Sequence, residues 1–174
     1  LKKEIVSLGK GRINMSDRKV NYIHPSNWNE LIERKDIKLI DIRNTYETKI
    51  GNFKNSIDPN TNSFREFPKK FNTIGIKKND NLALYCTGGI RCEKATSFIL
   101  KHGFEEVYQL KGGILNYFKN VEKKESFFKG ECFVFDDRVT LNHKLEKGIY
   151  NLCFACGNAI NKNDYISKYY EKAV

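Results

Sequence analysis

The stretch that decides the fold is Leu82-Ala83-Leu84-Tyr85-Cys86-Thr87-Gly88-Gly89-Ile90-Arg91-Cys92-Glu93-Lys94-Ala95. Its apolar first part predicts a buried strand, and a cysteine follows directly where that strand ends. Residues Arg91–His102 have helical spacing, with apolar side chains on one face. The stretch therefore predicts a strand–loop–helix turn, in which backbone N–H groups and the positive helix end form an anion-binding bowl beside Cys86.

A cysteine in such a bowl is expected to ionise easily. The bowl, the helix end and Arg91 should all lower the pKa of the Cys86 thiol, and a thiolate is a nucleophile at neutral pH. The alternative is a buried structural thiol, which is disfavoured by the two glycines and the arginine that follow at once. Cys92 is interpreted either as a resolving thiol for Cys86 or as a small residue in the first helical turn, and we favour the second.

Residues Cys86 to Arg91 resemble the active loop of the rhodanese family, whose cysteine carries sulfur as a persulfide. The longer stretch Cys86–Ala95, with Asn60–Pro68 and Phe133–Val139, is similar to the rhodanese-type tRNA uridine hydroxylases. This resemblance runs along nearly the whole chain. It implies an oxidoreductase that forms 5-hydroxyuridine at the wobble position of tRNA.

The resemblance also implies roles in the active loop. Cys86 would be the catalytic residue, through a covalent adduct or a persulfide. The backbone of Thr87, Gly88, Gly89 and Ile90 would hold an anionic intermediate, and Arg91 would fix the loop or add charge. Molecular oxygen and an unidentified reductant are implied as co-substrates, while no residues for haem, flavin or non-haem iron are evident in the sequence.

Supporting residues are expected around the loop. Asp41, Arg43 and Glu47 resemble a family pattern, and we interpret these charges as mainly structural, because a buried acid–base pair usually anchors a loop. The alternative is that Asp41 acts as a catalytic acid. Lys111 precedes a Gly-Gly pair and either adds positive potential near Cys86 or is a solvated lysine.

Charge and cysteine content bear on partners and compartment. The 174-residue chain has a net charge of +10, which favours a polyanion such as tRNA, although a general richness in Lys, Asn and Ile is a competing explanation. No signal peptide or membrane-spanning run is visible, so no membrane partner is expected. Five cysteines without a disulfide framework suggest a reducing, cytoplasmic compartment.

Three segments are expected along the chain. Residues 1–19 predict a linker and the remnant of a preceding domain, residues 20–121 the rhodanese-like domain, and residues 122–174 a small irregular extension with a Cys-x-x-Cys motif. Alternating strands and helices give an α/β class, with a parallel sheet covered by helices on both faces. The ligand site should lie at the carboxyl ends of the strands, near Cys86. The resemblance implies truncation at both ends, which leaves the activity of this chain open.

Smaller segments carry their own expectations. Gly51–Asn62 predicts a loop over the strand ends, and Cys132–Phe135 an extra strand or a packed segment. In Ser63–Asn72 we place the phenylalanines in the core and leave open whether Arg65 contacts RNA. Cys153 and Cys156 are at most half of a zinc site, because zinc takes four ligands and no second pair follows. A redox dithiol is the alternative there, without a thioredoxin-like context.

Other functions compete with hydroxylation. A sulfurtransferase would move sulfane sulfur as a Cys86 persulfide, with a sulfur donor or acceptor protein as partner, and the loop suffices for that chemistry. A phosphatase is disfavoured because four residues separate Cys86 from Arg91, one fewer than in rhodanese-like phosphatases. An inert binding module would usually lack the cysteine.

Overall fold

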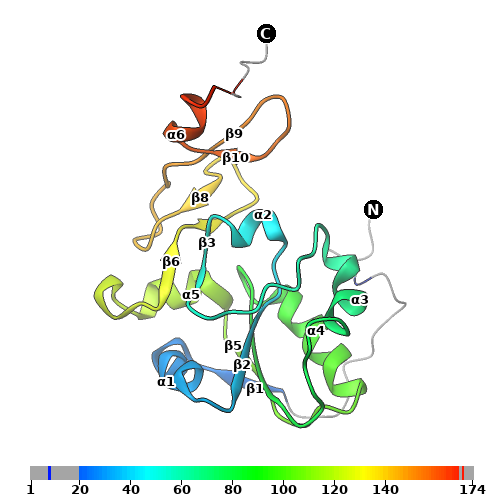
Figure 1. The fold of residues 1–174 in the computed structure, drawn as a ribbon. Helices are drawn as coiled ribbons and strands as arrows, with labels where there is room; N and C mark the ends of the chain where they lie inside the picture. Colours follow the sequence, from blue (N-terminus) through cyan, green and yellow to red (C-terminus); the bar gives the residue numbers. More distant parts are fainter. Residues whose placement is uncertain (1–7, 9–19, 169, 171–174) are drawn as a thin grey trace, which may run out of the picture.

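The central element is a sheet of four parallel strands. The computed structural model describes Leu8, residues 20–168 and Tyr170, so the expected remnant at residues 1–19 lies outside the described residues except for Leu8. The strand order is β1 (Asn21–Ile23), β5 (Val107–Leu110), β4 (Asn81–Tyr85) and β2 (Ile37–Asp41) (Figure 1). Ile37 pairs with Asn81 and Leu82 with Val107, which places the ends of β2 and β4 side by side.

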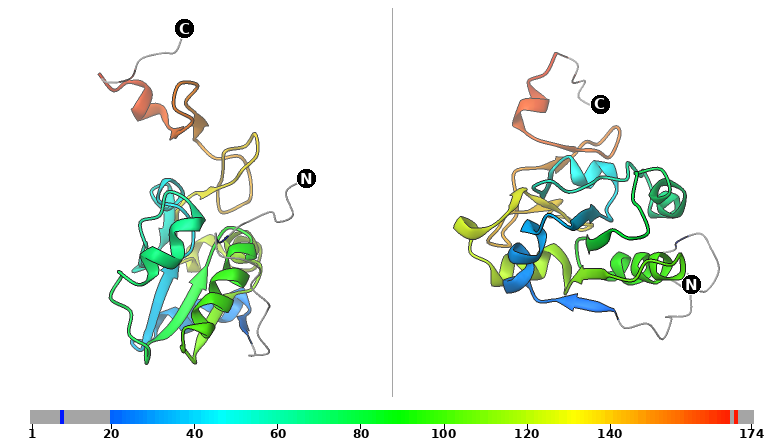
Figure 2. Two further views of the ribbon diagram at one scale, coloured as in Figure 1. Left: turned by 90° about the vertical axis from the view of Figure 1, so that its right-hand side faces the viewer. Right: turned by 60° about the horizontal axis from the view of Figure 1, so that its bottom comes forward.

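Both faces of this sheet are buried, as predicted. Helices α3 (Phe67–Phe71) and α4 (Ile90–Lys101) cover one face, and α1 (Trp28–Glu33) and α5 (Gly113–Asn120) cover the other (Figure 2). Alternate β4 side chains divide between the two cores, with Leu82 and Leu84 in the first and Ala83 and Tyr85 in the second. This alternation follows from the period of two in a strand.

The aromatic side chains of residues 63–72 lie in the first core. Phe64, Phe67 and Phe71 are all buried, which confirms their predicted place, whereas Arg65 is exposed. They belong to the short helix η2 (Phe64–Glu66) and to α3. Leu8 is also buried in this core.

The prediction of a loop over Gly51–Asn62 was wrong for its first residues. Gly51–Phe53 forms β3, which pairs antiparallel with β6 (Phe128–Gly130). The strand is too short to give a sequence pattern, and its partner lies far along the chain. The pairing joins the extension to the body of the domain.

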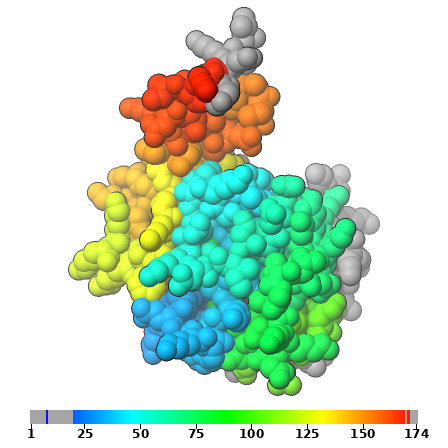
Figure 3. Space-filling view, viewed as in Figure 1, coloured from blue at the N-terminus to red at the C-terminus, as the bar shows by residue number. Residues whose placement is uncertain are grey.

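The rest of the extension consists of small ladders. Strands β7 (Cys132–Phe133) and β8 (Thr140–Leu141) pair, which confirms the extra strand, and β9 (Asn151–Leu152) pairs with β10 (Ala159–Ile160) before α6 (Lys162–Tyr165). A small core of Ile50, Phe133 and Val139 packs beneath them. Figure 3 shows the last part of the extension as a lobe projecting from the body beside α2 (Thr45–Thr48).

In the part of the chain that the structure describes there are also three short 3-10 helices, η1 (Pro25–Asn27), η2 and η3 (Lys123–Glu125). Within the described ranges, no helix has both the length and the apolar character needed to cross a membrane.

Candidate active site

The predicted strand–loop–helix turn is present around Cys86. Cys86 comes directly after β4, and α4 begins at Ile90. Gly89 caps the helix with a φ of 94°, a left-handed conformation that glycine adopts without strain. Its backbone N–H donates to Cys86 Sγ over 3.1 Å, so the loop directs a hydrogen-bond donor at the sulfur as expected.

The active loop packs closely against the start of α5. Ile114 N–H donates to the Cys86 carbonyl (3.0 Å) and Leu115 N–H to the Thr87 carbonyl (3.2 Å), so the start of α5 packs against the loop. A Cβ on Gly113 would collide with both carbonyl oxygens. In this close packing Cys86 is only 1% exposed.

The predicted fall in the pKa of Cys86 is confirmed, but its main cause differs. The pKa is lowered to about 6 chiefly by a hydrogen bond from the Cys92 side chain, with burial opposing and the charge of Arg91 assisting. Backbone N–H groups of Cys92 and Gly89 add to the effect. Burial and the neighbouring Cys86 raise the pKa of Cys92 well above its ordinary value. Cys92 therefore stays protonated and serves as the donor.

Arg91 fixes the loop through an acid on another element. Its guanidinium binds Glu47 at both oxygens, at 2.6 and 2.7 Å, and also donates to Thr87 Oγ1 at 3.2 Å. Glu47 is fully buried in α2, where its carboxylate also accepts the Asn44 N–H over 3.0 Å. A bidentate pair of this kind is rigid, so the active loop, α2 and α4 form one unit.

Asp41 and Arg43 form a second buried pair below the loop. Arg43 binds Asp41 through its backbone N–H (3.0 Å) and its guanidinium (2.6 Å), and it also donates to the Gly51 carbonyl (2.6 Å). Both side chains are completely buried. This geometry fits the structural interpretation, because the pair ties β2 to β3.

A cavity lies on the open side of the loop. It has a volume of about 650 Å³, and its lining includes Gly88, Gly89, Ile90, Lys111 and Gly112. Lys111 is exposed there, so its charge is placed beside the loop backbone. The cavity has room for part of a substrate.

The other cysteines differ in their surroundings, and Cys132 lies close to Arg43 and Thr87. Cys132 is buried, and burial raises its pKa to about 12. Cys153 and Cys156 lie in a turn of the extension closed by the Gly157 N–H to the Cys153 carbonyl (2.8 Å). Among the residues that the structure describes, no group of three or more His, Cys, Asp and Glu side chains is placed to hold a metal ion.

Three contributors were missed from the sequence. Glu47 pairs with Arg91, and the Cys92 side chain lowers the pKa of Cys86. The Phe135 ring centroid lies 5.8 Å from the Arg91 guanidinium. The position of Cys92 in the first helical turn after the loop was the signal available. No sequence signal connects Phe135 with Arg91, because they come from distant segments.

Comparison with known proteins places this site in a family. The model of the rhodanese-like domain matches residues 25–120. A tRNA uridine(34) hydroxylase of Picosynechococcus sp. is 52% identical over 175 residues, covering 100% of this chain and 59% of that protein. The protein of the same name from Pelagibacter ubique is 48% identical, covering 100% of this chain and 57% of that protein. The chain thus spans somewhat more than half the length of these curated relatives.

Solved structures support the fold. A crystal structure of a protein from Anabaena sp. superposes with a TM-score of 0.51 at 15% identity, covering 67% of this chain and 96% of that one. The solution structure of a rhodanese-like domain from Anabaena sp. gives a TM-score of 0.51 at 14% identity, with coverages of 64% and 80%.

Proposed function

The chain belongs to the rhodanese-like domain family, and from that premise we propose that it carries the active loop of a tRNA-modifying oxidoreductase. The reaction is hydroxylation of the wobble uridine to 5-hydroxyuridine, in the cytoplasm. The observation that carries this proposal is the identity of 48–52% with two tRNA uridine(34) hydroxylases along the full length of this chain.

Cys86 is the nucleophile in this proposal. Its lowered pKa supplies a thiolate at neutral pH, and thiolates add readily to electron-poor carbons such as C6 of a uracil ring. Addition at C6 makes C5 electron-rich, and C5 is the carbon that acquires the hydroxyl group. The Gly89 N–H and Arg91 stabilise the thiolate when it is released again.

The overall reaction requires molecular oxygen and a two-electron reductant. One oxygen atom enters the C5–H bond of the uridine, and the other leaves as water with two protons. tRNA is the macromolecular partner, and the net charge of +10 supports binding to it.

Complementation tests the proposal directly. This chain and a Cys86→Ser variant would be expressed in cells without their own wobble-uridine hydroxylases, and digested tRNA would be analysed by mass spectrometry. We expect 5-hydroxyuridine from the first chain and none from the second. Hydroxylation by the Cys86→Ser variant would refute the role of the thiolate.

A sulfurtransferase activity is the second candidate. The hydrogen bond from Gly89 to Cys86 and the nearby charge of Arg91 would also stabilise the terminal anion of a persulfide. A donor such as thiosulfate would transfer its sulfane sulfur to the Cys86 thiolate, with sulfite as the leaving group. Cyanide would then take this sulfur as thiocyanate, or an acceptor thiolate as its own persulfide, and the Cys86 thiolate would be released. A thiosulfate–cyanide assay that gives thiocyanate with this chain and none with Cys86→Ser would support this activity.

A further inference from the structure

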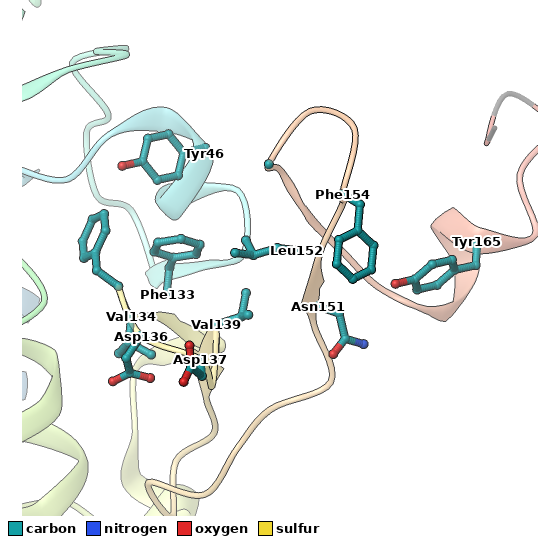
Figure 4. A pocket seen from close by; sticks show the side chains of 12 residues that line it. Tyr46, Phe133, Val134, Asp136, Asp137, Val139, Asn151, Leu152, Phe154 and Tyr165 are labelled. Carbon is teal, nitrogen blue, oxygen red and sulfur yellow. The ribbon is translucent and has the colours of Figure 1, made fainter. Parts of the chain in front are cut away.

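A second cavity lies between α2 and the C-terminal extension. It has a volume of about 730 Å³. Figure 4 shows its side chains, which come from four parts of the chain: Tyr46 from α2, Phe133 to Asp137 from the segment after β6, Leu152 and Phe154 near β9, and Tyr165 from α6. Such a size is typical of ligand sites.

Aromatic rings are exposed in this cavity to an unusual degree. Phe154 is 96% exposed and Phe135 is 68% exposed, and Tyr46 and Tyr165 are also partly open to solvent. Exposed rings grouped around one concave surface are an expected feature of sites where bases stack, since every nucleobase offers a flat π-face.

Polar groups without partners accompany the rings. The carboxylate of Asp136 is occupied by Arg138 at 2.7 Å, whereas Asp137 and the Asn151 amide have no side-chain hydrogen bond to any residue that the structure describes. A free carboxylate accepts from the N–H donors of a base edge but repels phosphate. The cavity is therefore suited to a base, with the RNA backbone outside it near the half-exposed Arg138.

The backbone that presents these groups is strained. Val139 closes the turn after Asp136 and Asp137, and its φ of 64° is a left-handed conformation that β-branched residues rarely adopt. The Val139 N–H donates to the Asp136 carbonyl (3.0 Å), and the Val139 carbonyl accepts from Val134 (2.9 Å). Strain of this kind is concentrated at binding and catalytic sites.

Two residues of the cavity lie beside the ion pair that holds the active loop. The Phe135 ring lies over the Arg91 guanidinium, and Tyr46 is next to Glu47, which holds Arg91. Arg91 in turn contacts Thr87 beside Cys86. A group bound in the cavity is thus connected to the catalytic loop through one buried ion pair.

We propose that this cavity binds an unstacked nucleobase next to the target uridine of the tRNA anticodon loop. The inference rests on the proposed function and adds a subsite to it. Phe154 stacks the base, and the unpaired polar side chains of the cavity hydrogen-bond to its edge.

Fluorescence of a modified RNA tests the subsite. The probe is an anticodon stem–loop RNA with 2-aminopurine beside the wobble uridine, because stacking on an aromatic ring quenches its emission. We expect quenching with this chain, and in Phe154→Ala a loss of quenching with affinity weaker by roughly five- to one-hundred-fold. Phe154→Tyr should restore both. Ile149→Ala, an exposed apolar residue of the extension outside the cavity, should bind and quench normally.

The outcomes separate this inference from the proposed function. Unchanged quenching and affinity in Phe154→Ala would overturn the subsite, as would hydroxylation in cells by a chain that never quenches the probe. In either case, the complementation result alone would decide whether the chain hydroxylates tRNA. Sedimentation would show whether the chain associates with itself. Self-association that depends on concentration and is abolished by Phe154→Ala would assign the cavity to a second copy of the chain. This result would also overturn the subsite.

Discussion

At the residue scale, the active loop combines two thiols with opposite pKa shifts. Cys86 is ionised more easily than an ordinary cysteine, and Cys92 less easily. The difference is maintained because Cys92 donates a hydrogen bond that stabilises the Cys86 thiolate. In the proposed reaction Cys92 is therefore a positioning residue for the nucleophile.

Removing the Cys92 donor should raise the pKa of Cys86. In a background of Cys153→Ser and Cys156→Ser, the alkylation rate of Cys86 should rise with pH around a midpoint near 6. In Cys92→Ala the midpoint should move upward, and each unit of increase lowers the thiolate fraction at pH 5 about ten-fold. Cys92→Ser keeps a donor and should shift the midpoint less. An equal midpoint in all three proteins would show that Cys92 does not tune the nucleophile.

A methyl group at Gly113 should displace the active loop. Gly113→Ala combines a φ of 65° with a collision against the carbonyl oxygens of Cys86 and Thr87. We expect the free energy of unfolding, measured with denaturant, to fall by roughly 3 kcal/mol or more. Gly75→Ala is the matched control, because its φ is 72° but nothing lies within 4 Å of the added carbon, so it should cost only about 1–2 kcal/mol. Equal losses would mean that the loop tolerates the added atom.

At the scale of elements, the contact between α2 and α4 holds the active loop in place. Arg91 in α4 and Glu47 in α2 form a pair whose side chains are 9% and 0% exposed. A charge left alone at this depth has no water to solvate it. The two short elements are thereby locked together beside Cys86.

Breaking this pair should be costly. Glu47→Gln leaves the Arg91 charge without its partner, and we expect a loss of about 3–5 kcal/mol in the free energy of unfolding. The control is Glu122→Gln, because the Lys124–Glu122 pair is 72% exposed at both side chains and exposed pairs contribute little. Similar denaturation midpoints for the two variants would contradict a structural role of Glu47.

Prediction from sequence succeeded for elements with strong local patterns. The apolar run before Cys86 and the helical spacing after it gave β4 and α4, and the alternation of strands and helices gave the doubly covered sheet. The β3–β6 pairing was not predicted, because each strand has three residues and the partners are far apart in sequence. The cavity beside α2 was not predicted either, since its lining residues come from segments that are distant in the sequence.

Charge is the property that acts at the scale of the whole molecule. The 31 basic and 21 acidic residues give the net charge of +10, but the buried pairs Arg43–Asp41 and Arg91–Glu47 cannot reach RNA. Exposed basic residues near the carboxyl ends of the strands are the ones that can. Arg65 and Lys69 are exposed there, and the preceding segment is held at the end of β2 by Thr61, which donates to the Arg43 carbonyl (3.4 Å).

Binding of tRNA should therefore depend steeply on salt and on these side chains. We expect the logarithm of affinity to fall linearly with the logarithm of salt concentration, because bound phosphates release counterions. Arg65→Ala should weaken binding for all tRNA sequences and reduce the slope by about 1. Lys77→Ala and Lys78→Ala are matched controls, because these exposed lysines precede β4 at the opposite end of the sheet from Cys86. Filter binding over a salt series would measure the slopes. The opposite result would be an unchanged slope in Arg65→Ala and a reduced slope in the control variants. It would place the RNA at the other end of the sheet, away from the thiolate, and would contradict the proposed reaction.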